Sequence, residues 1–167
     1  MSTENLDDLP RIEALAKELE EVWPRGYPKV ETFPADQDTD RSGMGWPRVA
    51  VLVDSVLRLP NLHFGFLRVI WAVGDRWVAA RYFIDAGTGA RTQRTLPKWS
   101  EPNEDPVEWI LQLCADDNRA FIQTTRDNYE AAGKSPREYP QWVRNAHVDI
   151  EVRAMFIDDA LEAHRAT

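Results

Sequence analysis

Cysteine is almost absent from this 167-residue chain, in which Cys114 stands alone. A single cysteine forms no internal disulfide, and the N-terminus MSTENLDDLP lacks the basic start and apolar core of a secretory signal peptide. No apolar run reaches the roughly 18 residues of a membrane-spanning helix, because Arg68 interrupts even residues 66–73. We therefore expect a cytoplasmic protein without membrane contact.

Positive charge is also scarce. The chain has 20 Lys and Arg residues against 28 Asp and Glu residues, which gives a formal net charge of -8. Binding to nucleic acid or to an anionic membrane depends on attraction to phosphate, which this charge opposes, so we expect neither as a partner. The length is that of one ordinary domain, and residues 1–167 are predicted to form a single domain.

Motifs for cofactors and metals are missing as well. The three histidines, His63, His147 and His164, are too far apart for the spacing of a zinc site. The alternating aspartates of residues 36–40 resemble the start of a calcium loop, but the required Gly and distal Glu are misplaced. There is no Walker loop, dinucleotide fingerprint or nucleophile elbow. The sequence therefore predicts no cofactor and no metal.

The first third of the chain predicts two helices separated by a long loop. Residues 9–23 carry apolar side chains at helical spacing, with Pro10 in the first turn. Residues 27–45 hold prolines, glycines and acidic residues without a sustained period, which is typical of a loop. In residues 46–58 one helical stripe predicts the second helix, and it consists of Trp46, Val49, Val53, Val56 and Leu57.

The stretch FLRVIWAVGDRWVAARYFIDAGTG, residues 66–89, predicts a β-hairpin. Its residues are β-branched and aromatic, and only Gly74-Asp75 interrupts them, which is typical of two strands joined by a tight turn. That turn places Arg68 opposite Arg81. Such a like-charge pair requires a neutralising neighbour.

The two faces of this hairpin differ in character. One face, with Val69 and Ala80, is almost wholly apolar, and we expect it to line a core or cavity. The opposite face is mixed and carries the aromatic residues Phe64, Phe66 and Phe83. Because these would otherwise be exposed, we expect a homodimer formed through that outer face.

The rest of the chain predicts a helical segment and a second hairpin. Asp105 as N-cap and Pro106 at the first helical position begin one long helix or two short ones, and Gly133 ends this segment. Residues 147–164 alternate between apolar and polar, which predicts two strands joined at Asp158-Asp159. This order predicts an α+β fold in which helices cover one face of an antiparallel sheet.

Four short signals, in this order along the chain, resemble a known family. They are Leu59-Pro60-Asn61, Gly74-Asp75, Gly87-Thr88 and His164-Arg165. In this pattern the chain resembles the SnoaL-like polyketide cyclase branch of the nuclear-transport-factor-two-like superfamily. The resemblance implies a cone-shaped, strongly bent antiparallel sheet whose N-terminal helices close a cavity. Two departures are a helical insert at about 91–145 and Ala166, where the cyclases carry an aspartate.

The resemblance implies a cofactor-independent enzyme of secondary metabolism. It would be a cyclase, isomerase or dehydratase that acts on an apolar polyketide- or terpenoid-like substrate. Its general acid/base catalysis would take place in an apolar cavity.

Five residues are candidates for that chemistry. His63 begins a strand and could act as acid or base, unless it lies at the surface of the strand edge. Tyr82 could donate its hydroxyl to an enolate or simply belong to the core. His147 and Asp149 alternate on the predicted last strand, where they form either a catalytic row or a solvated face. His164 belongs to the family-like terminal motif, in a position where the chain could fray.

A second hypothesis is a non-catalytic binding module. An acidic protein with seven tryptophans suits an immunity or inhibitor protein that meets a basic partner. The cavity distinguishes the two hypotheses. An enzyme for such substrates requires a pocket of several hundred Å3, whereas a binding module requires an exposed recognition surface.

Overall fold

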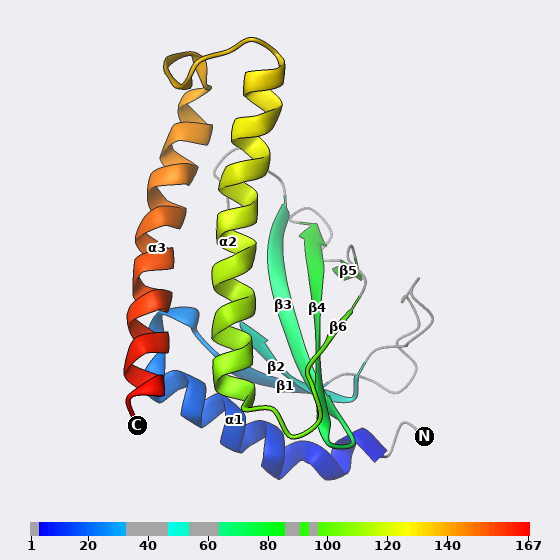
Figure 1. Cartoon of the computed structure of the whole chain (residues 1–167). Helices are drawn as coiled ribbons and strands as arrows, with labels where there is room; N and C mark the ends of the chain where they lie inside the picture. Colours follow the sequence, from blue (N-terminus) through cyan, green and yellow to red (C-terminus); the bar gives the residue numbers. More distant parts are fainter. Residues whose placement is uncertain (1–3, 33–46, 54–63, 86–90, 94–96) are drawn as a thin grey trace.

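The computed structural model of the chain describes residues 4–32, 47–53, 64–85, 91–93 and 97–167. Within these ranges the fold is α+β, as predicted (Figure 1). The helices and strands are α1 (Leu9–Val22), β1 (Lys29–Thr32), β2 (Val49–Val53), β3 (Phe64–Val73), β4 (Arg76–Asp85), β5 (Arg91–Gln93), β6 (Lys98–Trp99), α2 (Pro106–Ala131) and α3 (Gln141–Arg165). Short 3-10 turns lie at Glu4–Asp8, Pro24–Gly26 and Pro136–Glu138.

The strands form one open antiparallel sheet. Its order is β1-β2-β3-β4-β5. On the same edge of β4, β6 pairs with Val78 and Ala79 near the start of the strand, and β5 pairs with residues 82–84 near its end. The β3–β4 hairpin confirms the predicted register, because Arg68 lies opposite Arg81 and Val69 opposite Ala80. Gly74 in the turn has a φ of 60°, a left-handed conformation that glycine adopts without strain.

The apolar hairpin face is buried, as predicted, but the prediction that the opposite face is the outer one is wrong. The helices cover the face that carries the paired arginines, and Ile70 of this face belongs to the main core. Arg68 there forms a buried ion pair with Asp117 of α2, which is the neutralising neighbour that the like-charge pair requires. Val69 of the other face packs in a separate buried cluster with residues of β2. The described part of the expected outer, dimer-forming face is therefore packed against helices.

The predicted helix over residues 46–58 is also wrong where the structure describes it, because residues 49–53 form β2, a strand that pairs with β1 on one side and β3 on the other. All five of its residues are buried. A strand buried on both faces reads as a continuous apolar run, and periodicity cannot separate such a run from a buried helix. The predicted loop over 27–45 likewise contains β1, which pairs with β2.

The helices α1 and α2 begin where the sequence predicted. In α1, Ile12 and Leu19 face the core at helical spacing. In α2, Asp105 is the N-cap, and its side chain accepts a hydrogen bond of 3.1 Å from the backbone N–H of Val107. The helix continues without a break to Ala131, and Gly133 follows with a φ of 76°.

The C-terminal hairpin predicted for residues 147–164 is a single long helix, α3. Its buried residues follow a helical period, and they are Val143, Ala146, His147, Ile150, Ile157, Ala160 and Leu161. Asp158-Asp159 is therefore not a turn. Since α3 follows α2 directly, the segment 91–145 is not an insert between strands; α2 and α3 form an antiparallel pair (Figure 1).

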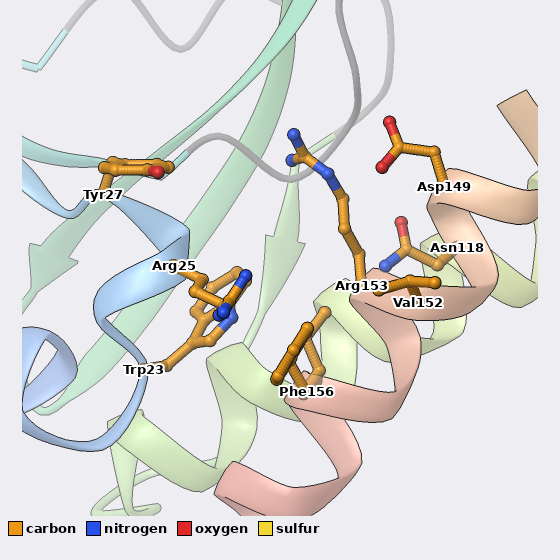
Figure 2. A pocket seen from close by; sticks show the side chains of 9 residues that line it. Trp23, Arg25, Tyr27, Asn118, Asp149, Val152, Arg153 and Phe156 are labelled. Carbon is orange, nitrogen blue, oxygen red and sulfur yellow. The ribbon is translucent and has the colours of Figure 1, made fainter.

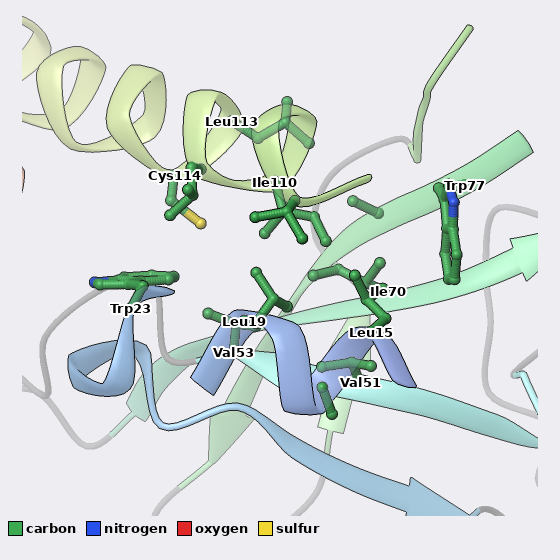
Figure 3. Close-up of a cluster of buried hydrophobic side chains, with 14 of the residues drawn as sticks. Leu15, Leu19, Trp23, Val51, Val53, Ile70, Trp77, Ile110, Leu113 and Cys114 are labelled. Atoms are coloured by element: carbon green, nitrogen blue, oxygen red, sulfur yellow. The ribbon is translucent and has the colours of Figure 1, made fainter. Parts of the chain in front are cut away.

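One main core joins the helices to the sheet (Figure 3). Leu15 and Leu19 of α1, Ile110 of α2, and Val51 and Ile70 of the sheet converge in it. Each of these side chains is at most 3% exposed, and burying one contributes about 1.5–3 kcal/mol. The helix α3 adds three residues at its C-terminal end to this core. None of the helices that the structure describes is long and apolar enough to cross a bilayer.

Candidate functional site

A cleft of about 150 Å3 opens between the segment after α1 and the side of α3 (Figure 2). One wall comes from residues 23–27 and the other from α2 and α3. The lining residues are Trp23, Arg25, Tyr27, Asn118, Asp149, Val152, Arg153, Phe156 and Ile157. The cleft therefore combines aromatic walls with two guanidinium groups, one amide and one carboxylate.

The segment WPRGY, residues 23–27, is shaped by close packing. Trp23 ends α1 and is buried at 5% exposure. Gly26 lies so close to the Trp23 ring that an added Cβ would stand 2.5 Å from Cε3. Only glycine fits there, and it lets the chain turn tightly over the indole.

Tyr27 at the rim of the cleft is strained. Its backbone is left-handed, with a φ of 48°, and its side chain is 72% exposed. This conformation is uncommon for a bulky residue and costs about 1–3 kcal/mol. No buried packing of the ring explains the strain, and strained residues cluster at functional sites.

Arg25 fastens this segment to α3. Its guanidinium carbon lies 3.8 Å from the centroid of the Phe156 ring, which is a cation–π contact. The contact joins the two walls of the cleft, because one partner belongs to each wall (Figure 2).

Asn118 forms the polar floor of the cleft. Its side chain is buried, with 1% exposure for the residue. Among the described residues, neither Nδ2 nor Oδ1 has a hydrogen-bond partner. A buried polar group without a partner costs about 1–3 kcal/mol. In Figure 2 its amide points into the space between the walls.

The charged groups of the cleft come from α3 and from residue 25. Arg153 is half-buried, and its guanidinium lies between the Tyr27 ring and the Asp149 carboxylate in the view of Figure 2. Arg25 and Arg153 against Asp149 give the lining a formal charge of +1, in a chain whose net charge is -8. The cleft is thus a locally positive spot on an acidic protein.

An apolar strip runs along α3 beside the cleft. Val148, Val152 and Met155 are 63%, 44% and 65% exposed, and their spacing of four and three residues places them on one side of the helix. Val152 also lines the cleft, so strip and cleft form one continuous surface. We call this surface the α3 face.

His147, a predicted site residue, lies away from the cleft. It is buried between α2 and α3, where Nε2 hydrogen-bonds Thr125 Oγ1 and the ring meets Phe121 and Tyr139 edge-on. Burial lowers the pKa of His147. The nearby Arg126 lowers it further, while Glu151 acts in the opposite direction. The lowered pKa favours the neutral imidazole, which connects α3 to α2 through its hydrogen bond with Thr125.

The other predicted residues are dispersed. His164 occupies the last turn of α3, where Nε2 lies 2.6 Å from Oδ2 of the α2 N-cap Asp105. Asp149 lies at the cleft. Tyr82 is on β4 opposite Leu67, but its side chain lies outside the described residues, as do His63 and the aspartates of residues 36–40.

Further groups in the described part of the chain do not form a second site. A groove of about 370 Å3 lies between α2 and α3, but its arginines are engaged, Arg119 with Asp158 and Arg165 with Glu108, each at 2.8 Å. Burial raises the pKa of Cys114, so its thiol stays protonated and inert. Across the described ranges no three His, Cys, Asp or Glu side chains gather to hold a metal ion.

Most cleft residues were not predicted. Trp23, Arg25 and Tyr27 were assigned to a helix end and a loop, and Asn118 and Arg153 to no site. The available signal was the segment WPRGY directly after a helix, in which Gly26 stands between an arginine and a tyrosine. No protein-family model, curated protein or solved structure matches the chain.

Proposed function

We propose that the chain is a non-catalytic binding module that recognises another protein through the α3 face. The size of the cleft carries this proposal. Its volume of about 150 Å3 equals that of an engineered cavity that holds one benzene molecule. Pockets for drug-sized molecules measure about 300–1,000 Å3. The cleft thus fits one side chain of a partner better than a whole polyketide or terpenoid.

The surroundings of the cleft support the same proposal. Protein interfaces place an anchor side chain in a small pocket and surround it with apolar contacts that exclude water. The strip of Val148, Val152 and Met155 supplies such contacts beside the pocket. Tyr27, an exposed aromatic residue in a strained conformation, stands at the opposite rim.

The test compares a charge on the α3 face with a charge elsewhere. Met155→Glu is the test variant, and Val73→Glu is the matched control, since Val73 is 43% exposed and lies at the end of β3. Tagged forms are expressed in the native cells, captured proteins are quantified, and each candidate partner is purified and titrated against all three forms.

The expected result is a partner that binds wild type and Val73→Glu equally and binds Met155→Glu at least about tenfold more weakly. Thermal unfolding of the free proteins checks that both variants are folded. Partners that bind all three forms alike would overturn the proposal. A second copy of this chain as the occupant would appear as concentration-dependent dimers lost in Met155→Glu.

A cofactor-independent enzyme of the SnoaL-like kind is a second proposal. The observation that favours it is Asp149, a predicted acid/base residue that lies at an aromatic cleft. Its site would lie in a cone-shaped cavity that also involves His63 and Tyr82. A panel of aromatic polyketides and terpenoids tests it, since a ligand of the native state raises the melting temperature. Turnover that is lost in both His63→Ala and Asp149→Asn would favour the enzyme over the binding module.

A further inference from the structure

We propose that the cleft binds a carboxylate, supplied by an Asp or Glu side chain of the protein partner. This inference rests on the proposed function and names the chemistry of its anchor. Its basis is that two guanidinium groups and a buried amide without a partner among the described residues line one side-chain-sized space (Figure 2).

The buried amide of Asn118 shows that the cleft is suited to a polar ligand. The residue is 1% exposed, and both its polar atoms lack a partner. Nearly all buried polar side-chain atoms in folded proteins have a partner, so an exception calls for an explanation. Asn118 is one of the residues that line the cleft, so a ligand oxygen that reaches Nδ2 would accept a hydrogen bond from it (Figure 2).

The two arginines of the cleft favour a negatively charged ligand. Among the described residues, neither Arg25 nor Arg153 pairs with a carboxylate. Arg25 instead contacts the Phe156 ring. Three other arginines of the α2–α3 pair have acidic partners, in the pairs Arg119–Asp158, Arg126–Glu151 and Arg165–Glu108, while Arg144 bonds to Gln141. Two unpaired guanidinium groups in such an acidic chain are available for a ligand, and their planar forks match a carboxylate.

The remaining lining favours a carboxylate over a phosphate. Asp149 at the cleft opposes any anion, and it repels a doubly charged phosphate more than a singly charged carboxylate. The formal lining charge of +1 balances one negative charge. The aromatic rings of Trp23 and Phe156 provide an apolar wall for the methylene stem of an acidic side chain.

The test uses a small probe that needs no partner protein. N-acetylglutamate N-methylamide is titrated into the full chain to about 50 mM, because a single anchor binds in the millimolar range. The readout is the NMR shift of the Asn118 side-chain amide and the Arg153 Nε–H. N-acetylglutamine N-methylamide is the neutral control, and inorganic phosphate is the second anion. Saturable shifts with the glutamate probe alone are expected.

Matched variants locate the binding. Arg153→Gln and Asn118→Leu should each weaken the glutamate probe about tenfold, because each removes a charge-assisted hydrogen bond. Arg144→Gln is the control on the same helix, since Arg144 is exposed and bonds to Gln141, and it should change nothing. Asp149→Asn should tighten binding about twofold, because it removes the opposing charge.

Three results would overturn the inference: no saturable shift, equal binding of the glutamine probe, or equal binding of phosphate. Its failure is distinguishable from failure of the proposed function. A partner that is lost in Met155→Glu but binds Arg153→Gln normally would leave the proposed function intact and refute the carboxylate. If the glutamate probe binds saturably but no partner depends on the α3 face, the carboxylate site stands and the proposed function is refuted.

Discussion

Asp117 and Asn118 are neighbours on α2, yet they face two different environments. Asp117 meets Arg68 of β3, and the side chains are 11% and 4% exposed. Asn118 faces the cleft, is equally well buried, and has no partner. One buried polar residue is thus matched inside the fold and the next is not.

The matched side shows how the fold tolerates charge. Arg68 and Arg81 lie opposite each other on the hairpin. The pKa of Arg81 is lowered, chiefly by burial and then by the charge of Arg68. The carboxylate of Asp117 offsets this crowding through its charge as an ion-pair partner, although within the described part of the chain neither Arg68 Nε nor Asp117 Oδ2 forms a hydrogen bond. Asn118 has no such partner among the described residues, which is why we place ligand recognition at the cleft.

The largest effect is expected from breaking the matched pair. Asp117→Ala leaves the Arg68 charge buried without its counterion and should lower the free energy of unfolding by about 3–5 kcal/mol. Urea denaturation of wild type and variant measures the difference. Asp117→Asn keeps the shape and one hydrogen-bonding oxygen, and should lose less. A change below about 1 kcal/mol in Asp117→Ala would contradict the assigned role of the pair.

The neighbouring position should respond in the opposite direction. Asn118→Leu removes a buried amide without a partner and should raise the free energy of unfolding by about 1 kcal/mol or more. The control is Asn128→Leu, because Asn128 is exposed on the same helix and should give no gain. Urea denaturation compares both with wild type. A clear loss of stability in Asn118→Leu would show that Asn118 is a structural residue.

Relief of the strain at the cleft rim should give a gain of similar or smaller size. Tyr27→Gly frees a left-handed backbone, so the free energy of unfolding should rise by about 1 kcal/mol. Tyr27→Ala removes the same ring but keeps the strain, and should give no gain. Thermal unfolding of both variants measures the contrast, and equal values for the two would rule out strain at this position.

Sequence-based prediction succeeded where local patterns determine the structure and failed where tertiary packing does. Where turn and cap residues mark a boundary, local patterns sufficed, as at Asp105 with Pro106 and at the hairpin turn of Gly74. The run at residues 49–53 failed because it is buried on both faces and therefore has no period.

The helix α3 was mistaken for a strand because of its own exposed strip. Val148 and Val152 face solvent, yet together with Ile150 of the core they produce an alternating apolar pattern. The apolar residues that point to a binding surface are thus the ones that misled the prediction. The cleft itself unites residue 25 with residue 153, and no local pattern encodes a contact between segments so far apart.

The smallest effect concerns a third buried polar residue, His147, which has a neutral partner in Thr125. Burial lowers its pKa in the folded state, so below the ordinary value of about 6.5 the unfolded chain takes up a proton that the native chain does not. Stability should therefore be fully present above that pH and decline as the pH falls through it. In His147→Gln this part of the decline disappears. Urea denaturation between about pH 8 and pH 5 tests it, and identical slopes for both proteins would mean that the imidazole is protonated inside the helix pair.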